Sequence, residues 1–333
     1  MDCLEKYKNK GLSGIINYGS TCYMNASIQS LSHTISLTDY FLSNTFQDKI
    51  RDKSGNIVAD LAIDFSNQWY RLIDGLWEDN CTVSPKSLFS LLKKVCKKKK
   101  IDLKITEHIQ NDIQEFFILI LDLIHCSMSE KKDFTIVTGN KLLKESSKSW
   151  NEFFKDDYSI IIELFYGQIM TEIKDVETGK VLSNVFQPIC FFPLPIDINS
   201  EHITLYDCFD EYLKEEQMEK HIVEGEERIV SKGIHIFRFP KIMIIILNRF
   251  NNDNTKKDVE VDFPLTLDMS RYNNNVTYDL YSICNHYGSS DMGHYTSYCK
   301  NNNKWYEFND NNVKSITNLE KKNAYCLFYK KDD

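Results

Sequence analysis

The first half of the chain places apolar residues at the spacing of amphipathic helices. Residues three or four positions apart share one face of an α-helix. Two groups show this spacing: Met24, Ile28, Leu31 and Ile35, and, more strongly, Ile109, Ile113, Phe116, Ile120 and Leu123. We therefore predict a short helix after residue 21 and a second helix that Asn111 can cap, with Gln114 completing a box-like start.

From about Tyr158 onward, short runs rich in β-branched and aromatic residues replace the helical spacing. Such runs are typical of strands. We predict strands at Ile160–Phe165, Ile234–Phe239, Lys241–Leu247, Tyr278–Cys284, His294–Cys299, Trp305–Phe308 and Tyr325–Tyr329. Helices first and strands later indicate an α+β fold rather than an alternating α/β fold.

Length and charge narrow the class of protein. The 333 residues allow one large domain or two small ones. A net charge of −8 argues against a dedicated nucleic-acid binder, which would normally be basic. The longest near-apolar runs, Phe116–Ile124 and Ile242–Leu247, are too short to span a bilayer. We predict neither a nucleic-acid partner nor a membrane partner.

The ten cysteines are scattered along the chain. No two form a C-x-x-C pair, and none stands at zinc-finger spacing from a histidine. Met1–Lys10 lacks the apolar core of a signal peptide. Unpaired thiols without an export signal predict a reducing, intracellular compartment, in which most of these cysteines act as small hydrophobic residues.

One cysteine, Cys22, has a setting that suits a nucleophile. Gly19 and Ser20 predict a turn, and Ser20 or Thr21 can cap the helix that follows, so Cys22 falls in the first helical turn. The unpaired amides and the dipole at that end favour a thiolate and can receive an oxyanion. Asn17 could bring a side-chain amide to the same place. Position alone also fits an inert thiol, so the assignment needs a base.

Among the eight histidines, His294 is the best candidate for that base. It follows the Gly288–Gly293 run and begins a predicted hairpin. A hairpin centred on Asn302 puts position 294 opposite position 310, so Asn309 or Asp310 lies beside the imidazole within one residue of register error. Such a neighbour can orient the imidazole, as in a Cys-His-Asn/Asp triad. A strand-edge histidine beside turn-forming residues is the alternative, and His286 is a rival base ranked second.

Together these segments resemble the signature boxes of the ubiquitin-specific proteases, papain-like cysteine peptidases also called ubiquitin carboxyl-terminal hydrolases. Gly14–Asn25 with Gln29 matches the cysteine box, with Ser20 as its main departure. Tyr278–Asp310 matches the histidine box. Further matches lie at Gln110–Phe116, Leu164–Gln168, Leu247–Phe250 and Phe263–Asp268. The order and spacing agree from about Gly11 to Tyr329.

The resemblance implies a papain-like hand with a helical thumb, β fingers and a β-sheet palm. After a short extension at 1–10, residues 11–333 would form a single catalytic domain. Within it, about 11–157 would be mainly thumb, 158–240 mainly fingers and 241–333 mainly palm.

The resemblance also implies a deubiquitinating enzyme that hydrolyses the peptide or isopeptide bond after ubiquitin's C-terminal glycine. Cys22 would be the nucleophile and His294 the general base and acid. Asn309 would orient His294, with Asp310 as possible support. Asn17 and the Cys22 amide would stabilise the oxyanion.

Substrate contacts are implied for Asp112, Glu115, Gly293 and Tyr295, although two acids in a first helical turn are expected from the dipole alone. The implied partners are ubiquitin and ubiquitinated proteins. We expect a monomer in the cytoplasm, the nucleus or both.

The resemblance departs at the zinc site that many relatives carry in the fingers. The first Cys pair should fall near Asp175 and Thr178 and the second around His221–Glu227, and neither place has a cysteine. We therefore predict fingers without zinc and no other cofactor.

Three alternatives stay open. The chain could act on a ubiquitin-like modifier, because the specificity surface is spread over the fingers. It could be a ubiquitin-binding scaffold whose catalysis has lapsed, although Cys22, His294 and Asn309 are all present. It could also be a general papain-like peptidase, but such enzymes are usually exported with disulfides.

Overall fold

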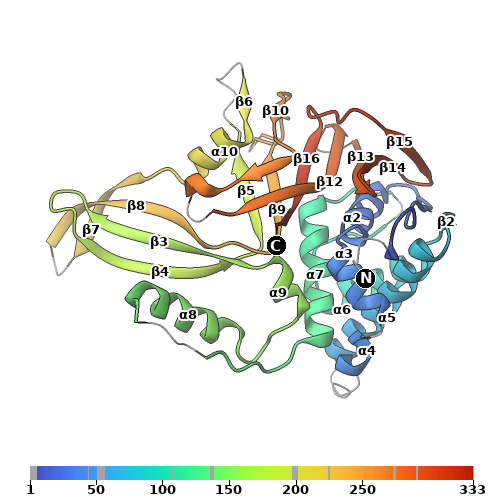
Figure 1. The fold of residues 1–333 in the computed structure, drawn as a ribbon, viewed down its shortest axis with the longest axis horizontal. Helices are drawn as coiled ribbons and strands as arrows, with labels where there is room; N and C mark the ends of the chain where they lie inside the picture. Colours follow the sequence, from blue (N-terminus) through green and yellow to red (C-terminus); the bar gives the residue numbers. More distant parts are fainter. Residues whose placement is uncertain are drawn as a thin grey trace.

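The computed structural model of the protein is a mixed helical and sheet molecule (Figure 1). It describes residues 6–43, 45–50, 57–106, 108–135, 139–196, 202–223, 226–251, 253–272, 275–289 and 292–332. Cys3 lies outside the described residues. The α+β prediction is confirmed: helices fill the first half of the chain, and strands dominate the second half.

The helices of the first half form one body at the lower right of Figure 1, except for α8, which lies apart. They are α2 (Cys22–Ser32), α3 (Ile35–Leu42), α4 (Thr45–Ile50), α5 (Ile57–Glu78), α6 (Lys86–Lys99), α7 (Ile113–Met128), α8 (Lys141–Phe154) and α9 (Ile160–Phe165). A short parallel pair, β1 (Gly14–Ile15) and β2 (Thr82–Val83), lies beside them. No helix in the described ranges is both long and apolar enough to cross a bilayer.

Helix α2 is buried on every side, so the expectation of an amphipathic helix is wrong. Several of its buried polar side chains form hydrogen bonds. The Ser32 hydroxyl accepts a hydrogen bond from Trp77 Nε1 at 2.8 Å, and Gln29 Nε2 donates to the Ser13 carbonyl at 2.7 Å. The helix also ends at Ser32, so Ile35, which the apolar spacing assigned to the same helix, instead begins α3.

The start of α7 corrects the predicted cap. Asp112, and not Asn111, is the N-cap, because its Oδ1 accepts hydrogen bonds from the backbone N–H groups of Gln114 and Glu115. Asn111 Nδ2 instead donates to the Tyr23 hydroxyl at 2.8 Å. Ile109 lies outside the helix, so the apolar spacing predicted a helix that starts about one turn before the observed one.

The predicted strand Ile160–Phe165 is wrong, because this segment is helix α9. A short apolar run fits a buried strand and a buried helix equally well. The residue before it decides: the Ser159 hydroxyl accepts a hydrogen bond from the Ile161 N–H at 3.1 Å and starts a helical turn.

A four-stranded antiparallel sheet projects away from the helical body (Figure 1). Its order is β4-β3-β8-β7, with β3 (Gly167–Asp175), β4 (Val181–Ile189), β7 (Glu216–Val223) and β8 (Glu226–Arg238). Helix α8 lies along β4, where the Ser149 hydroxyl donates to the Phe186 carbonyl at 2.9 Å. The predicted strand Ile234–Phe239 lies almost wholly within β8.

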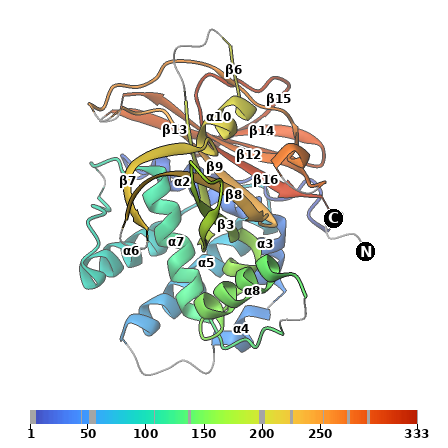
Figure 2. The same cartoon turned by 90° about the vertical axis from the view of Figure 1, so that its left-hand side faces the viewer.

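The second, larger sheet lies against the helical body (Figure 2). Its order is β15-β14-β13-β12-β16-β9-β5, and β11 adds to β12. The strands are β5 (Phe191–Pro195), β9 (Ile242–Asn248), β11 (Thr266–Asp268), β12 (Thr277–Gly288), β13 (Gly293–Asn301), β14 (Lys304–Asn309), β15 (Asn312–Ile316) and β16 (Ala324–Lys331). The remaining strand predictions are confirmed as β9, β12, β13, β14 and β16.

Strand β9 separates two hydrophobic cores. Ile242, Ile244 and Ile246 pack into the core shared with the helices. Met243, Ile245 and Leu247 face the opposite core, which α10 (Leu205–Tyr212) covers. Burial on both faces explains why this strand is an unbroken apolar run instead of an alternating one.

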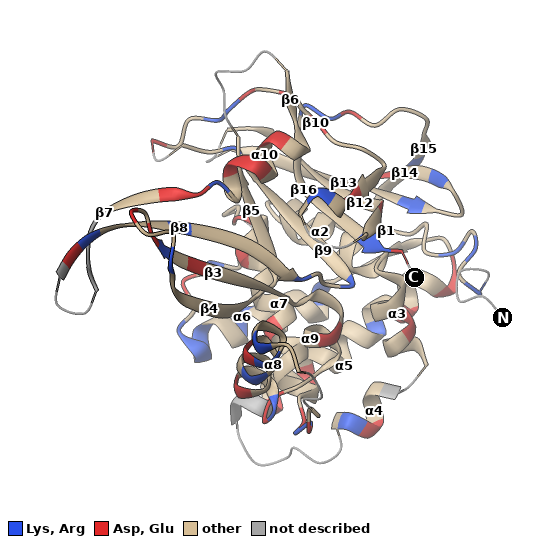
Figure 3. Cartoon of the chain, turned by 60° about the vertical axis from the view of Figure 1, so that its left-hand side comes forward, with Lys and Arg blue, Asp and Glu red and all other residues tan. Residues whose placement is uncertain are grey.

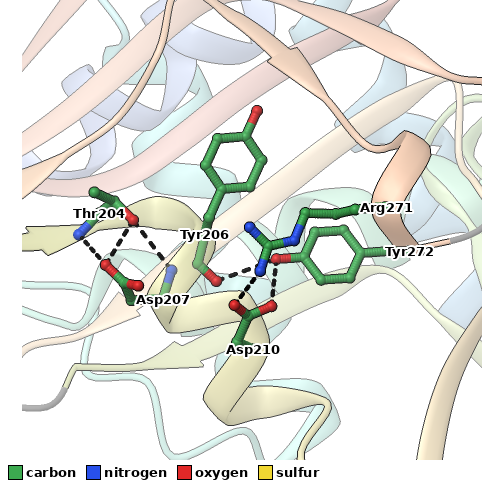
Figure 4. A network of polar contacts seen from close by, with 6 residues as sticks. All are labelled: Thr204, Tyr206, Asp207, Asp210, Arg271 and Tyr272. Atoms are coloured by element: carbon green, nitrogen blue, oxygen red, sulfur yellow. Dashed lines mark hydrogen bonds and ion pairs between the residues drawn. The ribbon is translucent and has the colours of Figure 1, made fainter.

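A polar network fastens α10 to the 3₁₀ turn η1 (Ser270–Tyr272) (Figure 4). Asp210 pairs with Arg271 and accepts a hydrogen bond from the Tyr272 hydroxyl at 2.8 Å. At the start of α10, Thr204 and Asp207 form a capping box. The parallel pair β6 (Ile203–Thr204) and β10 (Val261–Asp262) leads into this helix. These contacts stabilise the far core and lie outside the candidate site.

Basic and acidic residues alternate along the helices, strands and loops of the chain (Figure 3). Helix α6 ends in Lys97, Lys98 and Lys99, which suits the negative end of a helix dipole. The tip of the four-stranded sheet holds a more buried pair. Arg228 Nη1 lies 2.9 Å from Asp175 Oδ2, and the Asp175 side chain is only 2% exposed.

This pair generates a stability prediction. Arg228 and the Thr178 N–H lower the pKa of Asp175 to about 2. A lowered carboxyl pKa stabilises the fold above the ordinary value near 3.8 and loses that effect as pH falls through about 2. Asp175→Asn should therefore lower the thermal midpoint at pH 7, and the gap to wild type should shrink in acid.

Asp156→Asn is the matched control, because its 3.7 Å pair with Lys131 is exposed and such pairs contribute about 0–1 kcal/mol. Thermal melts at pH 7 and at acid pH measure both variants. Equal melting of Asp175→Asn and wild type at pH 7 would contradict the prediction.

Candidate active site

Cys22 is the first residue of α2, as the sequence predicts, and its side chain is 2% exposed. The turn before it is set by Thr21 and Asn17. The Thr21 hydroxyl accepts a hydrogen bond from the Tyr18 N–H at 2.9 Å and donates to Asn17 Oδ1 at 2.9 Å. Thr21 thus occupies the cap position but bonds backward, and its side chain does not cap the helix amides. The first turn of α2 therefore keeps amide hydrogens available beside Cys22.

His294 lies beside Cys22, although 272 positions separate them in the sequence. The His294 Nε2 and Asn309 Oδ1 atoms are 2.8 Å apart, so the amide oxygen accepts from a protonated Nε2. That bond leaves Nδ1 to exchange a proton with the thiol. The contact with Cys22, the largest cause, and the bond to Asn309 together raise the pKa of His294 to about 9, although burial opposes them. The three side chains form the contacts of a Cys-His-Asn triad.

The hairpin that brings Asn309 to His294 has nearly the predicted register. β13 and β14 pair Ser297 with Phe308 and Asn301 with Lys304, one residue from a register centred on Asn302. Asn302 and Asn303 both have positive φ, at 47° and 59°, as a tight hairpin turn requires. This register puts position 294 opposite position 311, so Asn309 reaches the imidazole as a diagonal neighbour rather than as the directly opposite residue.

His286 is a buried neighbour and unsuited to act as the base. Its side chain is 2% exposed, and its ring packs against Tyr295 at 4.6 Å and Phe250 at 5.5 Å between centroids. Burial, with help from Lys256, lowers the pKa of His286 to about 4. A Cβ on Gly293 would collide with this imidazole, so the glycine lets His286 support the start of β13 directly.

Asp310 bonds to the segment around Cys22 rather than to His294. Its Oδ2 accepts from Asn17 Nδ2 at 2.8 Å, and its Oδ1 accepts from Asn25 Nδ2 at 2.8 Å. Its backbone carbonyl accepts from the Ile15 N–H at 2.8 Å. Asp310 also raises the pKa of His294 slightly through its charge. It acts chiefly on the orientation of Asn17.

Gln110 is a site residue to which the sequence assigned no role. Its Oε1 accepts from the Gly293 N–H at 2.8 Å, and its Nε2 donates to the Gly293 carbonyl. The same Nε2 is 3.9 Å from Cys22 Sγ. Asn25 is a second such residue. Both belong to the matched family segments, which was the available signal, but their contacts depend on the tertiary fold.

The four predicted substrate contacts lie near one another at the start of α7 and β13. One carboxylate oxygen of Asp112 caps helix α7, and the other accepts a hydrogen bond from the Tyr325 hydroxyl at 2.7 Å. Glu115 is exposed, and partial burial and the nearby Asp112 raise its pKa. The Gly293 backbone is bonded to Gln110, and Tyr295 is a buried ring beside His286.

The first of the two zinc-site positions does not fit a metal. Asp175 occupies the place of a first cysteine, and its carboxylate is paired with the Arg228 guanidinium, whose charge would repel a cation. The side chains of 219–226, at the second place, lie outside the described residues. In the part of the chain that is described, no group of three His, Cys, Asp or Glu side chains could hold a metal ion.

Comparison with solved structures shows the fold. The chain superposes with a TM-score of 0.76 on a chain of the SAGA DUB module bound to monoubiquitin, at 24% identity, covering 99% of this chain and 70% of that one. A second structure, the SAGA Ubp8/Sgf11/Sus1/Sgf73 DUB module bound to ubiquitin aldehyde, gives a TM-score of 0.75 at 23% identity, covering 98% of this chain and 71% of that one. The hand of thumb, fingers and palm is thereby confirmed as the fold class.

Comparison with known sequences shows the family. The chain is 32% identical to ubiquitin carboxyl-terminal hydrolase Usp2 of Drosophila melanogaster over 97% of its length, and 30% identical to ubiquitin carboxyl-terminal hydrolase 2 of Homo sapiens over 98%. It spans 35% and 56% of those longer proteins. The family model described as ubiquitin carboxyl-terminal hydrolase matches residues 13–329, so the chain belongs to the ubiquitin carboxyl-terminal hydrolase family.

Proposed function

We propose that the protein is a deubiquitinating cysteine peptidase that hydrolyses the peptide or isopeptide bond after the C-terminal glycine of ubiquitin. The observation that carries this proposal is the triad: Cys22 at a helix start, His294 beside it, and Asn309 2.8 Å from the imidazole. Membership of the family supports the substrate, and so do the structural neighbours, one of which holds ubiquitin aldehyde.

In the proposed mechanism, His294 takes the thiol proton, and Cys22 Sγ attacks the carbonyl carbon of the last glycine. The oxyanion receives hydrogen bonds from the Cys22 amide and from Asn17, which Asp310 holds in place. Collapse of this intermediate expels the amine, which takes its proton from His294. Water activated by the same imidazole then hydrolyses the thioester.

We propose the same substrate-binding residues that the sequence suggests. Glu115 is the exposed carboxylate of the group, while Asp112 is fixed by its cap and by Tyr325. A pair of carboxylates in this arrangement suits the arginine-containing tail of ubiquitin. The Gly293 backbone and the Tyr295 ring complete the proposed binding region at the start of β13.

We further propose that the fingers are held without zinc, by strand pairing and by the Asp175–Arg228 pair. The single-domain organisation, the monomeric state and a cytoplasmic or nuclear location remain proposals. The nine cysteines in the described residues are all free thiols, which suits a reducing compartment.

The first prediction here concerns the nucleophile. Wild type should form a covalent adduct with a ubiquitin probe bearing a C-terminal electrophile and should hydrolyse a ubiquitin C-terminal amide reporter. Cys22→Ala should lose both, because Cys22 is the thiol that lies beside His294. Cys81→Ala is the control, since Cys81 is exposed and lies outside the triad. Equal turnover by wild type and Cys22→Ala would refute the proposal. Preferential reaction with ubiquitin-like probes would show that the substrate is a ubiquitin-like modifier rather than ubiquitin.

The second prediction concerns pH. Because contacts in the triad raise the pKa of His294 to about 9, the imidazole keeps the proton that the leaving amine needs up to about that pH. The value of kcat/KM should therefore decline above about pH 9. Asn309→Ala removes one cause of the raised pKa, so the alkaline limb should move to lower pH and kcat should fall at least about tenfold. Asn312→Ala, a change at an exposed position, is the control; an unmoved limb in Asn309→Ala would show that Asn309 does not act on His294.

The third prediction concerns metal. Exhaustive dialysis against a chelator should leave turnover and the thermal midpoint unchanged, because the Asp175–Arg228 pair requires no cation. Elemental analysis provides the independent check. A stoichiometric zinc content together with a lower midpoint after chelation would show that the fingers do bind metal.

A further inference from the structure

The side-chain amide of Gln110 is fixed in place at the candidate site. Its Oε1 accepts a hydrogen bond from the Gly293 N–H at 2.8 Å, and its Nε2 donates one to the Gly293 carbonyl. Turning the amide over would set donor against donor and acceptor against acceptor. The orientation of the two Nε2 hydrogens is therefore determined by the backbone of the residue before His294.

One Nε2 hydrogen bonds to the Gly293 carbonyl, and the other is directed toward the Cys22 thiol. Nε2 is 3.9 Å from Cys22 Sγ, too far for a strong bond to the thiol itself. In the intermediate, the oxyanion is the oxygen attached to the carbon that Sγ attacks. A donor at this distance from Sγ can therefore lie about 2.7–3.1 Å from the oxyanion, the range that such donors require.

The contacts of Asn17 make a second side-chain donor useful. Asn17 Nδ2 already donates to Asp310 at 2.8 Å, and its Oδ1 accepts twice from Thr21. Gln110 belongs to a different segment, the one before α7, and is held by Gly293 independently of Asp310. Two amides with separate anchors can thus approach one developing charge without reorganising.

We propose that Gln110 is a catalytic residue whose Nε2–H donates a hydrogen bond to the oxyanion of the acylation intermediate. This assignment rests on the proposed function. As the bond from Sγ to the carbonyl carbon forms, the π electron pair moves onto oxygen, and Gln110 stabilises that charge without transferring a proton. When the pair returns, the C–N bond breaks, the amine takes the proton held by His294, and the hydrogen bond to Gln110 weakens.

The test compares two reactions of the same thiol. Hydrolysis of the ubiquitin amide reporter passes through an oxyanion, whereas alkylation by iodoacetamide displaces iodide from a saturated carbon and forms none. Gln110→Met keeps the length of the side chain and removes the N–H. We expect kcat for hydrolysis to fall about 10²-fold with KM little changed, and binding of ubiquitin aldehyde to weaken in parallel. The alkylation rate, read at Cys22 by mass spectrometry, should fall far less than hydrolysis, because His286 and Lys256 still support the start of β13.

Gln68→Met is the matched control, the same change in the middle of α5. Gln110→Glu is the second variant: its ionised carboxylate lacks the donor, so its kcat relative to wild type should recover as pH falls and the acid gains a proton. Unchanged hydrolysis in Gln110→Met would overturn the assignment. A parallel loss of hydrolysis and alkylation would also overturn it, because Gln110 would then act by placing His294. Failure of wild type to process ubiquitin would instead refute the proposed function.

Discussion

The carboxylate of Asp310 joins the two parts of the chain that must meet for the site to exist. It accepts hydrogen bonds from Asn17 and Asn25, which precede it by 293 and 285 residues. Hydrogen bonds to a charged group contribute about 1.5–3 kcal/mol each, so one side chain ties the turn before Cys22 to the hairpin that carries Asn309. The Asp310 carbonyl strengthens the link by accepting from the Ile15 N–H.

The same link explains why α2 is buried so completely. A nucleophile at the start of a surface helix would move with that helix, but α2 is packed between the large sheet and the helices around it, and all its residues are buried. Burial of its serines costs little because they are bonded, as in the contact of Ser282 with Ser30 at 2.9 Å. The position of Cys22 is therefore set by the packing of both halves of the molecule.

The sequence was most informative where chemistry is local. The β13–β14 hairpin could be predicted because two asparagines that tolerate positive φ fix its turn, and the turn brings the segment that contains Asn309 close to His294. Helix α9 could not, since a six-residue apolar run fits either structure until Ser159 caps it. The resemblance named the triad residues, but the partners of Asp310 and Gln110 arise from contacts between distant segments that no periodicity encodes.

Three independent contacts hold the start of β13, and with it His294, in place. Gln110 bonds both backbone groups of Gly293, His286 packs where a Cβ of Gly293 would be, and Lys256 Nζ donates to the His286 carbonyl at 2.6 Å. These contacts come from the segment before α7, from β12 and from the segment after β9.

Since the pKa of His286 is lowered to about 4, this support stays uncharged through the pH range in which His294 titrates. A neutral buried imidazole beside a protonated one avoids the repulsion that two charged rings would suffer. In the proposed mechanism, His286 therefore supports the start of β13, and His294 carries the proton.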